Sequence, residues 1–465
     1  MSTSPLRPAL RHPARGWLAL ALVGVFSALG VKYTLKALDN RSAFQRWRPQ
    51  VLELEQGLDI SARHNYPNPP VMAVLLEPLA RLPPLAGALT WFALKAGLAL
   101  LALQWIFLLV EVPERPFPPR AKALAALLSL KPVADDLGHG NVNLFILFLV
   151  ASALALYRRR RDLSAGVVLA LAVACKVTPA LFVPYLAWKR SWKALAGVAL
   201  GLALFLYPGL LPSLRLGYGE NTRQLLSWYR GMARPFLVDG QATAKHTNQS
   251  LPGLAARLLT RSPSFARYDE RLGAYRPLRY DNLLSLAPAQ ARAAVHACLA
   301  GFALLVVLCC RTPAPPPGPR AGWRLAAEFS LVALGMLLFS ERTWKHHCVT
   351  LALPFAVLAY ARAYAPSPGW RFSLSAALAV VMLLLFLPSL GPSPDEDSAL
   401  SATFGKRAQV YGAYAAAELL LVGVLAMLLR KFPAGARPDG EGGGCGEWPL
   451  GHPAGLPPGE LPGEA

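Results

Sequence analysis

Four side chains between residues 340 and 351 have the chemistry to hold an anion. The segment reads "SERTWKHHCVTL" and separates two apolar runs, 331–339 and 348–361; its cationic and imidazole residues are Arg342, Lys345, His346 and His347. An arginine grips phosphate in a fork, a lysine acts as a point charge, and a histidine donates hydrogen bonds and carries protons near neutral pH. The segment predicts a site for an anionic group at headgroup depth, such as a lipid phosphate. Nonspecific contact with anionic lipid, with Trp344 as an interfacial aromatic, is the alternative.

One carboxylate follows the first apolar stretch of the chain. Asp39 lies in "LKALDNRSAF", beside Lys36 and Arg41. Ionisable residues at a membrane edge are candidate functional groups, and an aspartate can take the proton of an acceptor hydroxyl as a general base. An interfacial ion pair without a catalytic role is the alternative.

A lysine interrupts another apolar region. Lys176 lies in "CKVTP" (175–179), and a lysine at mid-membrane depth costs about 2.5–3.5 kcal/mol on insertion scales. We expect it to face a wet cavity or an anion, although its long side chain could also reach the surface.

The segment "KPVADDLGHGNVN" (131–143) contains further polar groups. Asp135, Asp136 and His139 are residue types that bind metals, but they lack the spacing of a metal site, and we expect none. Asn141 and Asn143 could bond sugar hydroxyls or cap the helix that follows. The six cysteines have no paired spacing and lie mostly in apolar runs, which argues against disulfides and zinc.

The composition indicates which elements must position these residues. The 465 residues are 54% hydrophobic and 16% charged, with a mean hydropathy of +0.37, whereas soluble proteins average about 25% charged residues. Several continuous apolar runs approach the roughly 20 residues that a helix needs to cross a bilayer. The predicted fold class is all-α, a polytopic membrane helical bundle of about eleven or twelve membrane segments. The net charge of +21 lies in short loops between these runs, which is typical of a topology signal and not of a nucleic-acid surface.

Placing the basic loops inside gives a path with both termini cytoplasmic. Three regions result: a cytoplasmic N-terminal segment (1–15), a transmembrane domain (16–430) and a Gly- and Pro-rich tail (431–465) expected to be disordered. Residues 163–188 begin and end at basic clusters, which predicts two half-helices that meet near Lys176. Val71–Arg81 is too short to cross and predicts an interfacial helix.

On this path the polar motifs converge at the outer face, and their order resembles that of glycosyltransferase family 87. The segments that carry the resemblance are Asp39, "YPNPP", "LLEPLARLP", "PVADDLGHGNVNLFILFL", "AGVVLALAVACKVTPALFVPYLAWKRSWK", "NQSLPGL" and "SERTWKHHCVTLALP". The chain differs from the usual family pattern after Asp39, at "YPNPP" and at "GNVN", which leaves the sugar and the acceptor open.

The resemblance implies a C-type architecture with an outer-face cavity and a metal-independent, cofactor-free, inverting transfer from a polyprenyl-phosphate sugar. By position it implies that Asp39 is the catalytic base, that His346 and His347 lie on the donor-phosphate side, and that Lys176 is the hairpin lysine. The remaining candidates for donor-phosphate or substrate binding are Arg342, Lys345, Asn143, Asn248 and Gln249.

The sequence thus predicts a glycosyltransferase of the bacterial cytoplasmic membrane. It would move a mannose-like hexose or a pentose to the hydroxyl of a glycolipid or glycan of the cell envelope, with membrane lipids and no nucleic acid as further partners. A transporter or lipid flippase is the main alternative, since it also places ionisable groups in broken helices. The lack of a second half resembling the first argues against it. An envelope assembly subunit with a decayed active site is a third interpretation.

Overall fold

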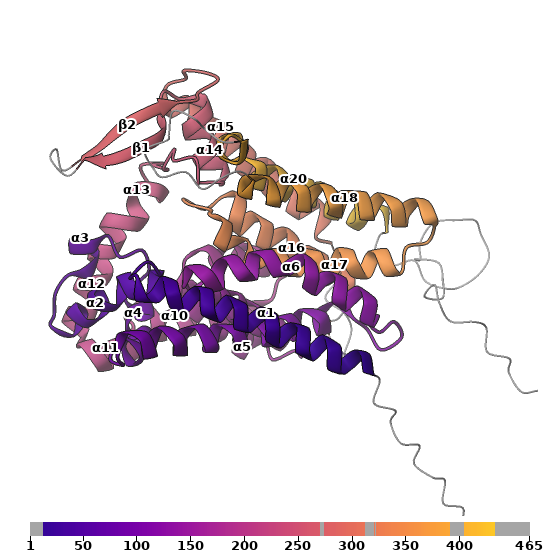
Figure 1. The fold of residues 1–465 in the computed structure, drawn as a ribbon, viewed down its shortest axis with the longest axis horizontal. Helices are drawn as coiled ribbons and strands as arrows, with labels where there is room; N and C mark the ends of the chain where they lie inside the picture. Colours follow the sequence, from indigo (N-terminus) through magenta and orange to yellow (C-terminus); the bar gives the residue numbers. More distant parts are fainter. Residues whose placement is uncertain (1–12, 270–273, 312–319, 321, 391–403, 433–465) are drawn as a thin grey trace, which may run out of the picture.

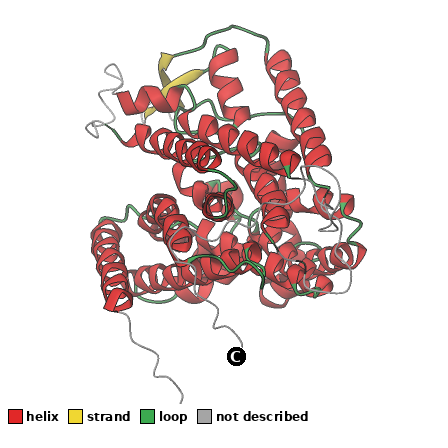
Figure 2. Ribbon diagram, turned by 90° about the vertical axis from the view of Figure 1, so that its right-hand side faces the viewer, coloured by secondary structure: helices red, strands yellow, loops and turns green. Residues whose placement is uncertain are grey.

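The computed structural model describes residues 13–269, 274–311, 320, 322–390 and 404–432. Residues 433–465 of the predicted disordered tail (431–465), the first twelve residues and the segment "SPDEDSALS" (393–401) lie outside these ranges, while Lys431 belongs to the last helix. The described chain is mostly helical, with one β-hairpin (Figures 1 and 2).

The N-terminal half is built from helices joined by short loops. In order these are α1 (Pro13–Leu38), α2 (Ala43–Glu55), α3 (Ile60–His64), α4 (Pro70–Ala80), α5 (Pro84–Val110), α6 (Pro119–His139), α7 (Asn143–Arg158), α8 (Asp162–Cys175), η1 (Thr178–Leu181), α9 (Phe182–Trp188), α10 (Trp192–Phe205), α11 (Leu210–Leu216) and α12 (Tyr218–Trp228).

The C-terminal half contains the hairpin and the remaining helices. In order these are η2 (Tyr229–Ala233), α13 (Arg234–Leu237), α14 (Leu251–Leu259), β1 (Pro263–Asp269), β2 (Ala274–Tyr280), α15 (Pro288–Cys309), α16 (Trp323–Leu338), η3 (Lys345–Leu351), α17 (Ala352–Ala363), α18 (Pro368–Phe386), η4 (Leu387–Ser389), α19 (Phe404–Val410) and α20 (Ala413–Lys431). In Figure 1 the two halves lie one above the other, and α13 joins them at the end where α2, α3 and α12 lie.

Five helical segments of the described chain are long and apolar enough to cross a membrane by length and composition alone. They are α5, the stretch Trp192–Leu216, α15, the stretch Pro368–Ser389 and α20. The structure thus confirms a mostly helical chain with helices suited to a membrane, and the count of eleven or twelve crossings remains a prediction. The core runs through α16 and α17, in which every residue from Leu325 to Leu338 and from Ala352 to Ala361 is buried.

Small residues let α8 and α10 approach closely. A Cβ added to Gly166 would lie 2.0 Å from the Ala194 carbonyl oxygen, and one added to Gly197 would lie 2.1 Å from the Leu163 carbonyl oxygen. Glycines at such contacts allow helix backbones to pack directly, as is common between membrane helices. This contact holds α8 firmly, and α8 ends directly before Lys176.

The predicted break near Lys176 is confirmed. Lys176 is extended between α8 and η1, and α9 then runs back. The Tyr157 hydroxyl lies 2.6 Å from the Ser191 hydroxyl, so residues just outside the two ends of the hairpin meet. The predicted short helix at Val71–Arg81 is also present, as α4, while its interfacial position remains a prediction.

The region 212–290, which separates α10 from the apolar helix α15, contains α12, α13, α14 and the β-hairpin. The polar segment 131–143 is helical over most of its length. Here α6 continues through Pro132 to His139 and ends at Gly140, whose φ of +77° favours glycine.

Candidate active site

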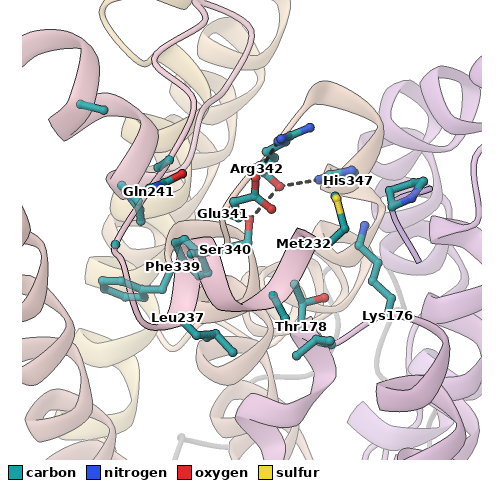
Figure 3. A pocket seen from close by; sticks show the side chains of 18 of the residues that line it. Lys176, Thr178, Met232, Leu237, Gln241, Phe339, Ser340, Glu341, Arg342 and His347 are labelled. Atoms are coloured by element: carbon teal, nitrogen blue, oxygen red, sulfur yellow. Dashed lines mark hydrogen bonds and ion pairs between the residues drawn. The ribbon is translucent and has the colours of Figure 1, made fainter. Parts of the chain in front are cut away.

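A cavity of about 1010 Å³ lies between the two halves (Figure 3). Its wall comes from α2, the loop 65–69, the ends of α6 and α8, α12 to α16 and the loop 339–347. Polar lining residues include Arg46, Asn65, Asn68, His139, Asn141, Lys176, Arg342 and His347. Apolar lining residues include Val177, Leu181, Met232, Leu237, Val295, Leu299, Met336 and Phe339. The cavity is therefore amphipathic, and it joins motifs that are far apart in the sequence.

Lys176 is held in the cavity wall by a chain of polar groups. Its Nζ donates to Asn143 Oδ1, and Asn143 Nδ2 donates to Asp136 Oδ1 over 3.0 Å. Asp136 Oδ2 in turn lies 3.2 Å from Lys95 Nζ, and both of these side chains are fully buried. A buried ion pair with additional hydrogen bonds has little freedom to move, so this chain fixes the direction of Asn143 and, through it, of Lys176.

The turn after α6 connects this chain to the histidines. A Cβ at Gly140 would lie 3.0 Å from the Tyr33 hydroxyl, and Trp91 Nε1 donates to the Gly140 carbonyl over 3.1 Å. The next residue, Asn141, places its Nδ2 3.2 Å from His346 Nε2. Asn141 and Asn143 thus orient a histidine and a lysine of two distant segments.

Three imidazoles form one cluster. The rings of His139 and His346 stack at 4.1 Å and 13°, and His347 meets His346 edge-on at 4.7 Å. Nδ1 of His347 lies 3.0 Å from the Arg342 carbonyl oxygen (Figure 3). Burial lowers the pKa of both His346 and His347 well below the usual range, and neighbouring cationic groups lower it further. Both rings are neutral near pH 7 and act as hydrogen-bonding groups, not as charges.

Positive charge at this end of the cavity therefore comes from Lys176 and Arg342. Figure 3 shows both side chains around the same end of the cavity as the neutral His347. Arg342 is partly neutralised by Glu341, whose carboxylate lies 2.9 Å from Arg342 Nε. Burial raises the pKa of Glu341, and the contact with Arg342 lowers it.

The other predicted site residues do not line this cavity. Lys345 is exposed and lies 3.5 Å from Asp135, His346 lies behind His347, and Asn143 lies behind Lys176 at a small adjoining void of about 20 Å³. Such a void can hold about one water molecule.

Asn248 and Gln249, predicted to bind substrate, are buried away from the cavity and bond to backbone. Asn248 Oδ1 accepts from the Thr343 N–H over 2.9 Å, and its Nδ2 donates to the Glu341 carbonyl over 2.9 Å. The N–H of Gln249 donates to the Thr343 carbonyl over 2.7 Å. Through these contacts, Asn248 and Gln249 position the loop that carries Arg342.

Asp39 lies outside the cavity, directly after α1. Its side chain is 60% exposed, and its Oδ2 lies 3.7 Å from Arg41 Nε. Two contacts tie this region to the cavity rim: Lys36 Nζ donates to the Gly138 carbonyl over 3.0 Å, and Arg46 donates to the Arg41 carbonyl over 3.1 Å. Arg46 lines the cavity, and it is only seven residues after Asp39 in the sequence. The segment that carries Asp39 therefore leads directly to the edge of the cavity.

Within the described residues, no three His, Cys, Asp or Glu side chains form a group that could hold a metal. Asp135 pairs with Lys131 at 2.7 Å, Asp136 pairs with Lys95, and His139 stacks on His346.

Sequence reasoning missed Lys95 and Arg46. Lys95 had a signal, because it is a lone charge in the apolar run 91–110.

Comparisons with known proteins agree with the motif order. The model of "Glycosyltransferase family 87" matches residues 66–340. A polyprenol-phosphate-mannose-dependent alpha-(1-2)-phosphatidylinositol mannoside mannosyltransferase of Mycolicibacterium smegmatis is 25% identical over 342 residues, which cover 70% of this chain and 68% of the relative. The enzyme of the same name from Mycobacterium tuberculosis is 27% identical over 202 residues, covering 41% and 45%. No solved structure matches the chain.

Proposed function

The chain belongs to glycosyltransferase family 87, and on that basis we propose that it transfers a sugar from a polyprenyl phosphate to an acceptor hydroxyl, with inversion, at the outer face of the cytoplasmic membrane. The relatives are named for a polyprenol-phosphate-mannose donor and a phosphatidylinositol mannoside acceptor. For this chain we propose a mannose-like hexose or a pentose as the sugar, and a glycolipid or glycan as the acceptor.

The observation that carries the proposal is the amphipathic cavity. One end presents Lys176, Arg342 and His347, while apolar residues of α15, α16 and the α8–η1 break line another part of the wall. A polyprenyl phosphate has the same division, with a charged phosphate at one end of an apolar chain. Exposed leucines of α15, among them Leu304 and Leu308, would face the lipid from which such a donor enters.

We assign the phosphate to the cationic end. When the bond between the anomeric carbon and the phosphate oxygen breaks, the phosphate gains negative charge. Lys176 and Arg342 would stabilise this charge, while the neutral His347, whose Nδ1–H donates to the Arg342 carbonyl, would hold the loop that carries Arg342. Their positions are set before substrate binds, which lowers the cost of reorganisation in the transition state.

We assign the proton transfer to Asp39. The acceptor oxygen attacks the anomeric carbon, the acceptor proton passes to the Asp39 carboxylate, and the polyprenyl phosphate leaves with the bonding electrons. A single displacement of this kind inverts the anomeric configuration. It requires the acceptor to enter between Asp39 and the cavity, where Arg46 forms the rim.

The test is transfer by the purified protein in lipid nanodiscs. It is given short-chain polyprenyl phosphates of mannose and of several hexoses and pentoses, with envelope glycolipids as acceptors. We expect one donor to give a glycosylated product whose anomeric configuration, measured by NMR, is opposite to that of the donor. Two results together would overturn the proposal in favour of transport. They are absence of transfer from every donor, and uptake of a solute or lipid into liposomes that contain the same protein.

A further inference from the structure

A second part of the cavity wall is built for a different ligand group. It is formed by Trp47 of α2, the loop residues Asn65 and Asn68, and Trp228 of α12. None of these residues has a role in phosphate binding or proton transfer as described above. They combine aromatic rings with amides, and the two kinds of side chain point to a ligand with both apolar and hydroxyl-bearing surfaces.

Asn68 carries an unused donor. The residue is 6% exposed and lines the cavity, and its Nδ2 has no hydrogen-bond partner among the described residues. A buried amide N–H that loses water without gaining a partner costs free energy. An acceptor atom supplied by a ligand in the cavity would remove that cost.

The neighbouring phenol does not satisfy this amide. Tyr66 is fully buried and does not line the cavity, and its hydroxyl also has no hydrogen-bond partner within the described ranges. Burial raises the pKa of Tyr66, and a hydrogen-bonding approach of the Asn68 side chain lowers it, although the two groups do not meet the geometry of a hydrogen bond. Both polar groups are thus present without a well-formed bond between them.

The loop that carries Asn68 is fixed on both sides. Trp228 Nε1 donates to the Pro67 carbonyl over 3.3 Å, and the Tyr66 ring meets the Trp47 ring at 6.0 Å and 72°. Because the Trp228 N–H is already used, this residue offers a ligand its ring and not its donor. Asn68 is therefore presented to the cavity by a preformed loop between two tryptophans.

We propose that Asn68, with the rings of Trp47 and Trp228, forms a subsite for a pyranose ring, in which the amide bonds a sugar hydroxyl and the aromatic rings cover its C–H face. This deepens the proposed function and rests on it. The donor and the acceptor can both carry such a ring, and the shared chemistry does not depend on which of them occupies the subsite.

The test compares Asn68→Ala with the control Tyr66→Phe in nanodiscs. The two probes are a short-chain mannosyl phosphoryl polyprenol and a phosphatidylinositol mannoside, and each is measured by its Kd and, where transfer occurs, its KM. We expect Asn68→Ala to weaken the binding of one probe by about tenfold, with Tm close to that of the wild type. Tyr66→Phe should change the binding of neither probe by more than about twofold. The probe that is weakened identifies the sugar ring as that of the donor or of the acceptor.

Three results would overturn the subsite: neither probe binds the wild type, neither is weakened by Asn68→Ala, or Tyr66→Phe causes the same loss as Asn68→Ala. The last would mean that the two residues only support each other. Binding that depends on Asn68, in a protein that transfers sugar from none of the hexose and pentose donors of the transfer assay, would retain the subsite and overturn the proposed function, so the two failures are distinguishable.

Discussion

Lys176 and Asp39 are the two groups to which we assign the main chemical roles, and the protein surrounds them differently. Lys176 ends a chain of polar contacts that runs through Asn143 and Asp136 to the fully buried Lys95. Asp39 is 60% exposed and has one ion-pair partner at 3.7 Å. The fold thus builds the phosphate end in advance, while the acid lies at an open rim where a second substrate can enter. Binding and proton transfer should therefore be separable by mutation.

The largest effect is expected at Asp39. Asp39→Asn preserves the size of the side chain but removes the proposed base, and we expect kcat to fall by about 10²- to 10⁴-fold. The control Arg41→Gln should reduce kcat by less than about threefold, because an exposed ion pair contributes little. Steady-state transfer kinetics measure both; full activity of Asp39→Asn would reject the base assignment.

The next effect tests how rigidly the phosphate end is built. Asp136→Asn leaves Lys95 buried without its counter-ion, and we expect a loss of about 3–5 kcal/mol in the free energy of unfolding. Adding Lys95→Met removes the unpaired charge and should restore most of this stability. A double-mutant cycle followed by thermal unfolding measures the coupling. Additive losses would mean that the pair does not act as a unit.

A smaller effect is expected behind the loop that carries Arg342. Asn248→Ala removes hydrogen bonds to the backbone of Glu341 and Thr343, which should cost about 1–3 kcal/mol and lower kcat/KM through misplacement of Arg342. Asn282→Ala is the control, since within the described residues that amide bonds to Leu284 and Ser285 of its own turn. If Asn248→Ala instead raised KM for the donor at unchanged stability, the original prediction of direct substrate binding would be favoured.

The smallest effect concerns pH. Burial lowers the pKa of His246 from 6.5 to about 4, and the ring stacks on Phe265 at 4.2 Å. Folding favours the neutral form, so this contribution to stability is complete above about pH 6.5 and is lost as the pH falls towards 4. His246→Gln should remove about one proton of uptake on unfolding in that window. An unchanged slope of stability against pH would contradict the assignment.

The sequence predicted the break at Lys176 because lysine and proline there interrupt an apolar region that must turn back. It could not predict that Asp136 pairs with Lys95, or that Asn143 connects Asp136 to Lys176. Depth in the membrane can be read from composition, but the facing partner of a buried polar group depends on helix rotation and packing. Asn248 illustrates the same limit: its motif predicted proximity to the site, and only the fold reveals that the side chain faces the backbone behind it.

The most direct test of this division of roles is the affinity of the protein for a non-transferable phosphonate analogue of the polyprenyl-phosphate sugar. Lys176→Met should weaken binding at least about tenfold, while the control Lys193→Met, which removes an exposed lysine next to Trp192 at the start of α10, and Asp39→Asn should bind as the wild type does. Equal weakening by Lys176→Met and Asp39→Asn, or wild-type affinity of Lys176→Met, would contradict the account.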